Sequence, residues 1–252
     1  KPTATVASAT MASVRFWDRM TRESNAHARL MGGYAPREGR TSMNAKNGVW
    51  LALFVGVLAW SGIAPKDRFT WFLEVVPAMI GLVLILATRK RFPLTPLLYG
   101  LVLVHCIILM VGGKYTYAEV PLFDGLFGST RNNYDKLGHF AQGFIPAILA
   151  REILIRRAVV NGRAWLNVIS VSLCLAFSAL YELIEWAVAE ASGESAEAFL
   201  GTQGYVWDTQ SDMLLALVGA MVSLVLLSRW HDAQLAELKA RTTPVACWPV
   251  PK

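Results

Sequence analysis

Three short stretches of the sequence place ionisable residues three or four positions apart, each beside an apolar run. The stretches are "YDKLGHFAQG", "YELIEW" and "WDTQSDML", and the pairs are Asp135 with His139, Glu182 with Glu185, and Asp208 with Asp212. Residues three or four apart share one face of a helix. Each pair therefore presents two polar groups to a single neighbour. Imidazole and carboxylate groups together are typical ligands of Zn, Mn and non-haem Fe.

The elements that carry these pairs are apolar enough to be membrane helices. The chain is 54% hydrophobic and only 17% charged, whereas a soluble domain is about 25% charged. Charge is nearly absent from six runs, at residues 49–63, 71–88, 94–113, 137–150, 164–180 and 213–228. A helix of about 20 apolar residues crosses the bilayer core. We therefore expect an all-α, polytopic integral membrane protein with six transmembrane helices. The prediction of a membrane span is weakest for the fourth run, because Arg151 and Glu152 follow it closely.

The distribution of charge predicts the topology. Six spans place both termini and two of the loops on one face, and that face carries most of the 24 lysines and arginines. Short basic loops stay cytoplasmic, so both termini are expected inside. The net charge of +6 is thus a topology signal, and no nucleic-acid partner is expected. We divide the chain into a basic cytoplasmic arm (1–45), a six-helix membrane domain (46–230) and a cytoplasmic tail (231–252).

The three polar pairs are expected to meet at the outer membrane edge. Glu182 lies about 27 Å along its helix from Ala164, at the far side of the hydrocarbon, and the other two pairs begin spans that enter from that side. Charged groups at this depth need partners, water or a cation. The candidate ligands of a divalent metal are His139, Glu182, Glu185, Asp208 and Asp212. The residues expected to orient these ligands or to contact a substrate are Asp135, Lys136, Gln142 and Gln203. No catalytic residue is assigned.

Other interpretations of the same residues stay open. Lys136 and Arg131 are able to neutralise the carboxylates, so that the cluster only clamps three helices together. The cluster is also suited to a cationic lipid headgroup. The long basic arm and charged tail favour an accessory or assembly subunit of a larger membrane complex, with membrane lipids and other subunits as partners. An ion-coupled transporter is disfavoured, because little beyond His105 is ionisable at mid-span.

The ordered motifs "NYDKLGHFAQGF", "YELIEW" and "LGTQGYVWDTQSDM" resemble the YjdF-type bacterial inner-membrane proteins, and more distantly the VanZ-like proteins. The resemblance covers roughly residues 45 to 230. It implies a multi-pass protein of the bacterial inner membrane and marks the polar motif residues as signature positions, without implying a reaction. VanZ-like proteins are associated with glycopeptide resistance, but this chain has Trp186 and Ala216 where those proteins tend to have Gln and Asn.

Overall fold

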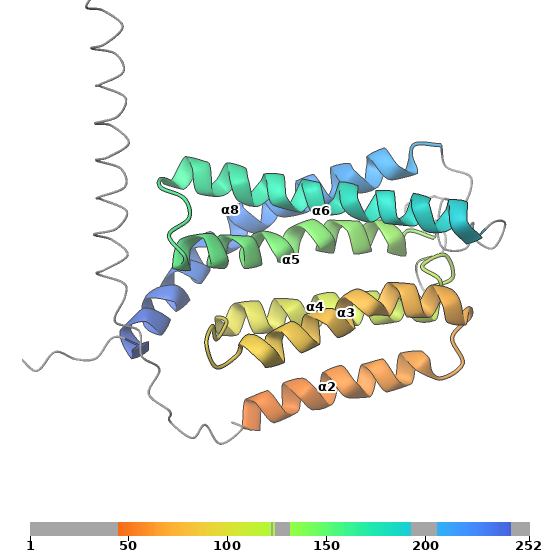
Figure 1. Ribbon diagram of the computed structural model, residues 1–252, viewed down its shortest axis with the longest axis horizontal. Coiled ribbons are helices and arrows are strands. Elements are labelled where there is room, and N and C mark those ends of the chain that lie inside the picture. The colour runs from red at the N-terminus through yellow and green to blue at the C-terminus, as the bar shows by residue number, and fades with distance from the viewer. Residues whose placement is uncertain (1–44, 122, 124–131, 193–205, 243–252) are drawn as a thin grey trace, which may run out of the picture. The chain divides into compact units, whose positions relative to one another are not determined.

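The computed structural model describes residues 45–121, 123, 132–192 and 206–242, all within one unit, Met43–Lys252. The expected arm, 1–45, lies almost wholly outside this part of the chain. The described residues contain no β-strand, which confirms the all-α class. They form α2 (Ala45–Gly62), α3 (Arg68–Thr88), α4 (Pro96–Lys114), α5 (Tyr134–Arg156), α6 (Arg163–Ser192) and α8 (Asp208–Thr242) (Figure 1).

The six expected apolar runs fall on these six helices, one run on each. By length and composition, α3, α4, α6 and α8 qualify as membrane spans. The apolar stretch of α2, Asn47–Gly62, is shorter, and α5 is less apolar. That all six helices cross the bilayer stays a prediction.

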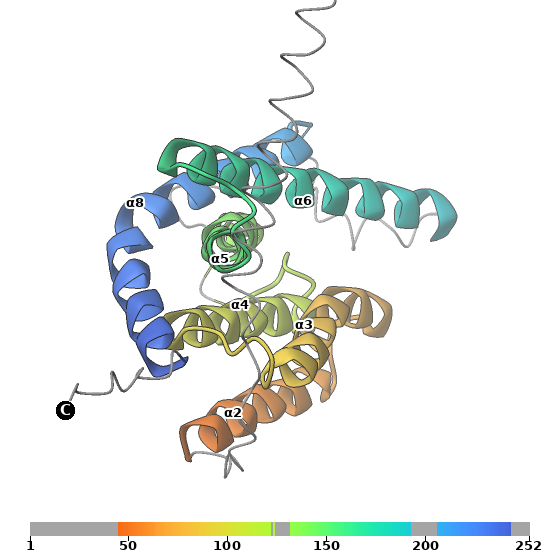
Figure 2. The same cartoon turned by 60° about the vertical axis from the view of Figure 1, so that its left-hand side comes forward.

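The lower apolarity of α5 follows from its central position. Figure 2 shows α5 almost end-on, and it packs against α4, α6 and α8. Its polar residues His139, Arg151 and Glu152 are buried against these neighbours. A charged residue within a membrane segment is tolerated when it faces the bundle interior and is paired there. Arg151 and Glu152, which made the prediction of the fourth span the weakest in the sequence, therefore mark the helix that packs against three neighbours.

Small residues bring α5 and α8 into backbone contact. A side-chain carbon at Gly143 would collide with the carbonyl oxygen of Ala216, and one at Gly219 would collide with that of Phe140. Small residues permit this close approach between membrane helices, where packing rather than burial from water drives association. The helices that carry the first and third polar pairs are thus held in a fixed register.

The last helix, α8, continues through the boundary expected at residue 230. Its 35 residues span roughly 50 Å, more than the about 30 Å of a bilayer core. The helix curves toward α4 (Figures 1 and 2), where Gln234 Oε1 accepts a hydrogen bond of 2.8 Å from the backbone N–H of Leu97. The first turns of the segment 231–252 are therefore part of the helical bundle, and their cytoplasmic location stays a prediction.

A side-chain cap fixes the start of α3, the helix that later contributes Glu74. The backbone N–H of Thr70 donates a hydrogen bond of 2.6 Å to Asp67 Oδ1. Such a cap satisfies one of the free N–H groups at a helix start. The same bond lowers the pKa of the Asp67 carboxyl below its usual value.

Candidate functional site

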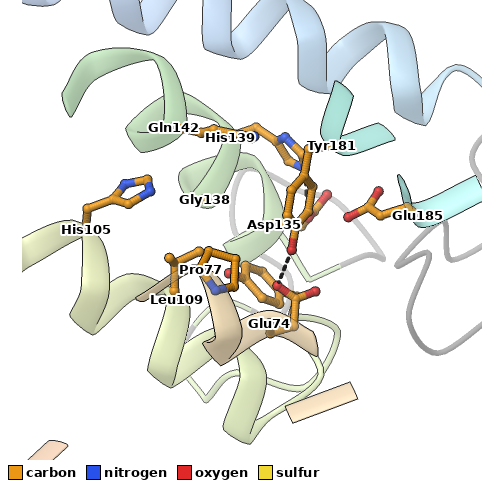
Figure 3. Close-up of a pocket in the computed structure, with 11 residues that line it drawn as sticks. Glu74, Pro77, His105, Leu109, Asp135, Gly138, His139, Gln142, Tyr181 and Glu185 are labelled. Atoms are coloured by element: carbon orange, nitrogen blue, oxygen red, sulfur yellow. Dashed lines mark hydrogen bonds and ion pairs between the residues drawn. The ribbon is translucent and has the colours of Figure 1, made fainter. Parts of the chain in front are cut away.

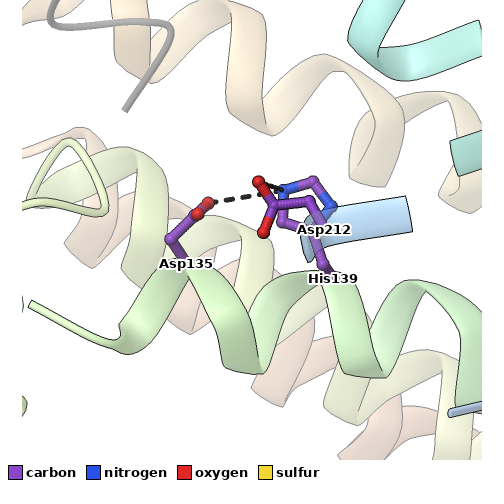
Figure 4. A group of neighbouring side chains, drawn as sticks. All are labelled: Asp135, His139 and Asp212. Carbon is purple, nitrogen blue, oxygen red and sulfur yellow. Dashed lines mark ion pairs between the residues drawn. The ribbon is translucent and has the colours of Figure 1, made fainter. Parts of the chain in front are cut away.

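The first and third polar pairs lie side by side, on α5 and α8. His139 Nε2 is 3.4 Å from Asp135 Oδ1 and 3.8 Å from Asp212 Oδ2 (Figure 4). From α6, Glu182 Oε1 approaches His139 Nδ1 to 3.9 Å. We call Asp135, His139, Glu182 and Asp212 the His139 cluster. It brings together residues from three helices.

The distances within the His139 cluster are long for hydrogen bonds and suit a shared cation. An N–H···O bond has its donor and acceptor about 2.9 Å apart. Two ligand atoms each about 2.1 Å from a metal ion are roughly 3.0 Å apart in octahedral geometry and about 3.4 Å apart in tetrahedral geometry. One ligand atom from each of Asp135, His139 and Asp212 lies within 4.8 Å of the others. Small side-chain shifts would therefore bring these three ligand atoms to coordination distance from a metal ion placed between them.

Several polar atoms of the cluster are buried without a hydrogen-bond partner among the described residues. They are His139 Nδ1, Glu182 Oε1 and Asp212 Oδ1. The side chains of His139 and Asp212 are only 8% and 5% exposed. Buried polar atoms in proteins are usually hydrogen-bonded, and each exception calls for an explanation. Neither Asp212 nor Glu182 forms an ion pair with a lysine or arginine in the described part of the chain. The arrangement therefore favours a cation as the partner.

A cavity of about 90 Å³ adjoins the cluster, between α3, α4, α5 and α6 (Figure 3). Glu74 of α3 and Tyr181 of α6 meet across it, where Tyr181 Oη donates a hydrogen bond of 3.0 Å to Glu74 Oε2. Gln142 and His105 line the end of the cavity deeper along α4 and α5, and His105 Nδ1 has no partner among the described residues. A site with acids from several helices thus opens into a small mixed polar and apolar space.

The remaining predicted residues occupy different places. Glu185 lines the cavity and is buried. Asp208 is buried at the first residue of α8, one turn before Asp212. Lys136 is half-buried and forms no ion pair with an acid in the described part of the chain. Gln203 lies outside the described residues.

Sequence reasoning missed the contribution of Tyr117 to the cavity. Thr116 and Tyr117 both have left-handed backbone angles, with φ of 55° and 56°. This turn at the end of α4 lays the Tyr117 ring against Gly112 and Gly138. An added side-chain carbon would collide with the ring at Gly112 and would be in tight contact with it at Gly138. Non-glycine residues in this conformation cost energy and collect at functional sites. No local sequence pattern predicted this turn, because tyrosine rarely adopts a left-handed conformation.

A second buried cluster, which sequence reasoning also missed, lies at the other end of α5. Glu152 is fully buried and accepts hydrogen bonds of 2.8 Å from Thr95 Oγ1 and 2.7 Å from Arg156 Nη1. His231 Nε2 lies 3.0 Å from the same carboxylate. The Arg156 guanidinium also stacks on the Phe92 ring, 3.5 Å from its centroid. These contacts join α4, α5 and α8.

The partners of His231 complete this second cluster. Its Nδ1 is 2.9 Å from Arg151 Nη1, and Arg151 Nη2 donates a hydrogen bond of 2.7 Å to Asp232 Oδ1. We define the Glu152 cluster as Thr95, Arg151, Glu152, Arg156, His231 and Asp232. The available sequence signals were the Glu152–Arg156 spacing of four and the adjacent His231 and Asp232, but the latter fell in the expected tail.

Comparisons with known proteins agree with the membrane architecture. A family described as "Predicted membrane protein (DUF2238)" matches residues 47–233, a range that includes both clusters. The chain is 53% identical over 182 residues to "Inner membrane protein YjdF" of Escherichia coli (strain K12), covering 71% of this chain and 87% of that protein. No solved structure gives a significant match. The resemblance to YjdF-type proteins is confirmed, and the more distant one to VanZ-like proteins stays a prediction.

Proposed function

This chain belongs to the DUF2238 family of predicted membrane proteins, and we propose that its His139 cluster binds one divalent metal ion. The protein is an integral inner-membrane protein with several apolar helices. The observation that carries the proposal is the approach of three ligand atoms, from Asp135, His139 and Asp212, to within 4.8 Å of one another.

The proposed topology has six membrane spans, cytoplasmic termini and the cluster at the periplasmic edge. The cluster lies at the N-terminal ends of α5 and α8, and the basic residues Arg89, Arg91 and Arg157 lie at the opposite ends of the bundle, near the C-termini of α3 and α5. Basic residues near span ends favour the cytoplasmic side, which supports this orientation.

The proposed coordination uses His139 Nε2 and one carboxylate oxygen each from Asp135 and Asp212. Glu182 then faces the other ring nitrogen of His139, where a carboxylate orients the imidazole and raises its basicity. Compared with the ligand set expected from the sequence, Asp135 thus becomes a ligand and Glu182 an orienting residue. One imidazole with carboxylates suits Zn, Mn or Fe.

The alternative is an accessory subunit of a larger membrane complex in which the cluster is a metal-free helix clamp. It accounts for the burial of the cluster. It does not account for Asp212 Oδ1, which is buried without a hydrogen-bond partner among the described residues and which a metal ion at this place would engage. A clamp works through short, satisfied contacts, so we favour the metal site.

The test is metal analysis of protein purified in detergent, stripped with a chelator and reconstituted with Zn, Mn or Fe(II). We expect about one equivalent of one of these ions, and at least a tenfold weaker affinity in His139→Ala, Asp135→Asn and Asp212→Asn, because removing even an orienting partner costs 10- to 100-fold. Glu119→Gln is the control, since Glu119 is 56% exposed and pairs with Lys66. Wild-type protein that binds none of these ions contradicts the proposal and supports the clamp.

A further inference from the structure

We propose that the cavity beside the His139 cluster binds the primary ammonium group of an ethanolamine-type phospholipid, held by Glu74 and Glu185. The inference rests on the proposed function in one respect. A metal ion engages Asp135 and Asp212, which leaves Glu74 and Glu185 as the acids that face the cavity.

The first argument is charge. Glu185 is 8% exposed, lines the cavity and forms no hydrogen bond or ion pair with another described residue (Figure 3). Glu74 is 4% exposed and receives a hydrogen bond from the neutral Tyr181 hydroxyl. A buried carboxylate without a compensating charge is costly, and no described lysine or arginine pairs with either acid. A cation in the cavity compensates both.

The second argument is the chemistry of the lining. Besides the two acids, the cavity is bounded by the Tyr181 hydroxyl and by the apolar Pro77 and Leu109. A primary ammonium has three N–H donors, enough for both carboxylates and a hydroxyl, while its methylene groups contact apolar walls. A hydrated inorganic ion has no apolar groups that could contact the apolar walls. At about 90 Å³ the cavity has room for a small headgroup fragment but not for an acyl chain.

The third argument is access, which favours a lipid as the source of the amine. Among the described helices, α3 packs against α4, whereas α6 packs against α5 and α8. Across the cavity, α3 and α6 are joined by the Tyr181–Glu74 hydrogen bond. Both helices also expose large apolar side chains, such as Ile80 at 54% and Phe177 at 60%, which suit contact with acyl chains. A headgroup from the surrounding bilayer therefore reaches the cavity between α3 and α6.

The experiment is native mass spectrometry of the full-length, metal-loaded protein with phosphatidylethanolamine, phosphatidylcholine and phosphatidylglycerol of identical acyl chains. We expect preferential retention of phosphatidylethanolamine, because the trimethylammonium group of phosphatidylcholine has no N–H donor. Glu185→Gln and Glu74→Gln should each weaken this binding by roughly 10- to 100-fold, the value of a hydrogen bond to a charged group. Glu190→Gln, at an exposed position on the same helix, should bind like wild type.

Each result has one interpretation. Equal retention of the ethanolamine and choline lipids, or unchanged lipid binding in Glu185→Gln, overturns the ammonium site. Free ethanolamine that binds as tightly as the lipid supports the ammonium site and overturns the lipid as its source. Metal content separates this inference from the proposed function. Glu185→Gln should keep its metal, and a metal-free wild type that still selects phosphatidylethanolamine refutes the metal site alone.

Discussion

The buried histidines at the two ends of α5 have opposite surroundings. The ring nitrogens of His231 lie 2.9 Å from Arg151 Nη1 and 3.0 Å from Glu152 Oε2, both hydrogen-bond distances. The Nε2 atom of His139 lies 3.4 Å and 3.8 Å from its two nearest carboxylates. His231 is held by short hydrogen bonds, whereas the contacts of His139 are longer ion-pair distances.

The balance of charge explains the difference. In the Glu152 cluster, Arg151 and Arg156 accompany Glu152 and Asp232, so every acid has a cation beside it. In the His139 cluster, three acids surround a single imidazole. Matched charges at short distances favour a structural clamp, whereas a surplus of one sign at longer distances favours the ligand site that we propose. The short, charge-matched contacts that a helix clamp requires are therefore present in the Glu152 cluster.

The largest effect expected from this comparison is on stability at the Glu152 cluster. Glu152→Gln should lower the free energy of unfolding by about 3 kcal/mol, because it leaves buried cations without their counter-charge. Denaturant unfolding in detergent micelles, followed by tryptophan fluorescence, measures this loss. Metal affinity at the His139 cluster, at the other end of α5, should stay within twofold of wild type. A loss of stability below 1 kcal/mol would show that the cluster is not a clamp.

A smaller effect is expected at the close contact between α5 and α8, the two helices that contribute residues to both clusters. Gly143→Ala forces a methyl group against the Ala216 carbonyl, and overpacking of this kind costs about 1–3 kcal/mol. Because Gly143 lies one turn from His139, separation of α5 and α8 should also weaken metal binding by at least tenfold. Gly81→Ala is the matched control, since nothing lies within 4 Å of its added carbon. Metal titration and unfolding of both variants test this, and equal behaviour of the two would refute the role assigned to close packing.

The sequence predicted well what depends on local spacing. Apolar runs located all six helices, and separations of three or four positions identified the polar pairs, because both follow from the helical repeat. The convergence of α5, α6 and α8 was also inferred, from the common depth of Asp135, Glu182 and Asp212 in successive spans.

Features that depend on distant contacts could not be predicted in the same way. Glu152 and His231 are 79 positions apart, and Glu74 and Tyr181 are 107 apart. No helical repeat relates such residues, and only the packing of α4, α6 and α8 against α5, and of α3 against α4, brings them together. The proposed division of roles between Asp135 and Glu182 likewise depends on which ring nitrogen of His139 each one faces, which is set by the side-chain rotamer.

The smallest effect has the opposite sign to that of Glu152→Gln. Asp212 lies in the field of Asp135, Asp208 and Glu182, and His139 Nε2 is the opposing group beside it, 3.8 Å from Asp212 Oδ2. In protein stripped of metal, Asp212→Asn therefore removes more repulsion than attraction, and the free energy of unfolding should stay unchanged or rise. With metal added, the wild type should become the more stable of the two, because only its folded state binds the ion. Unfolding curves with and without metal measure both differences. A stripped Asp212→Asn variant that loses about 3 kcal/mol would instead make the His139 cluster a second clamp.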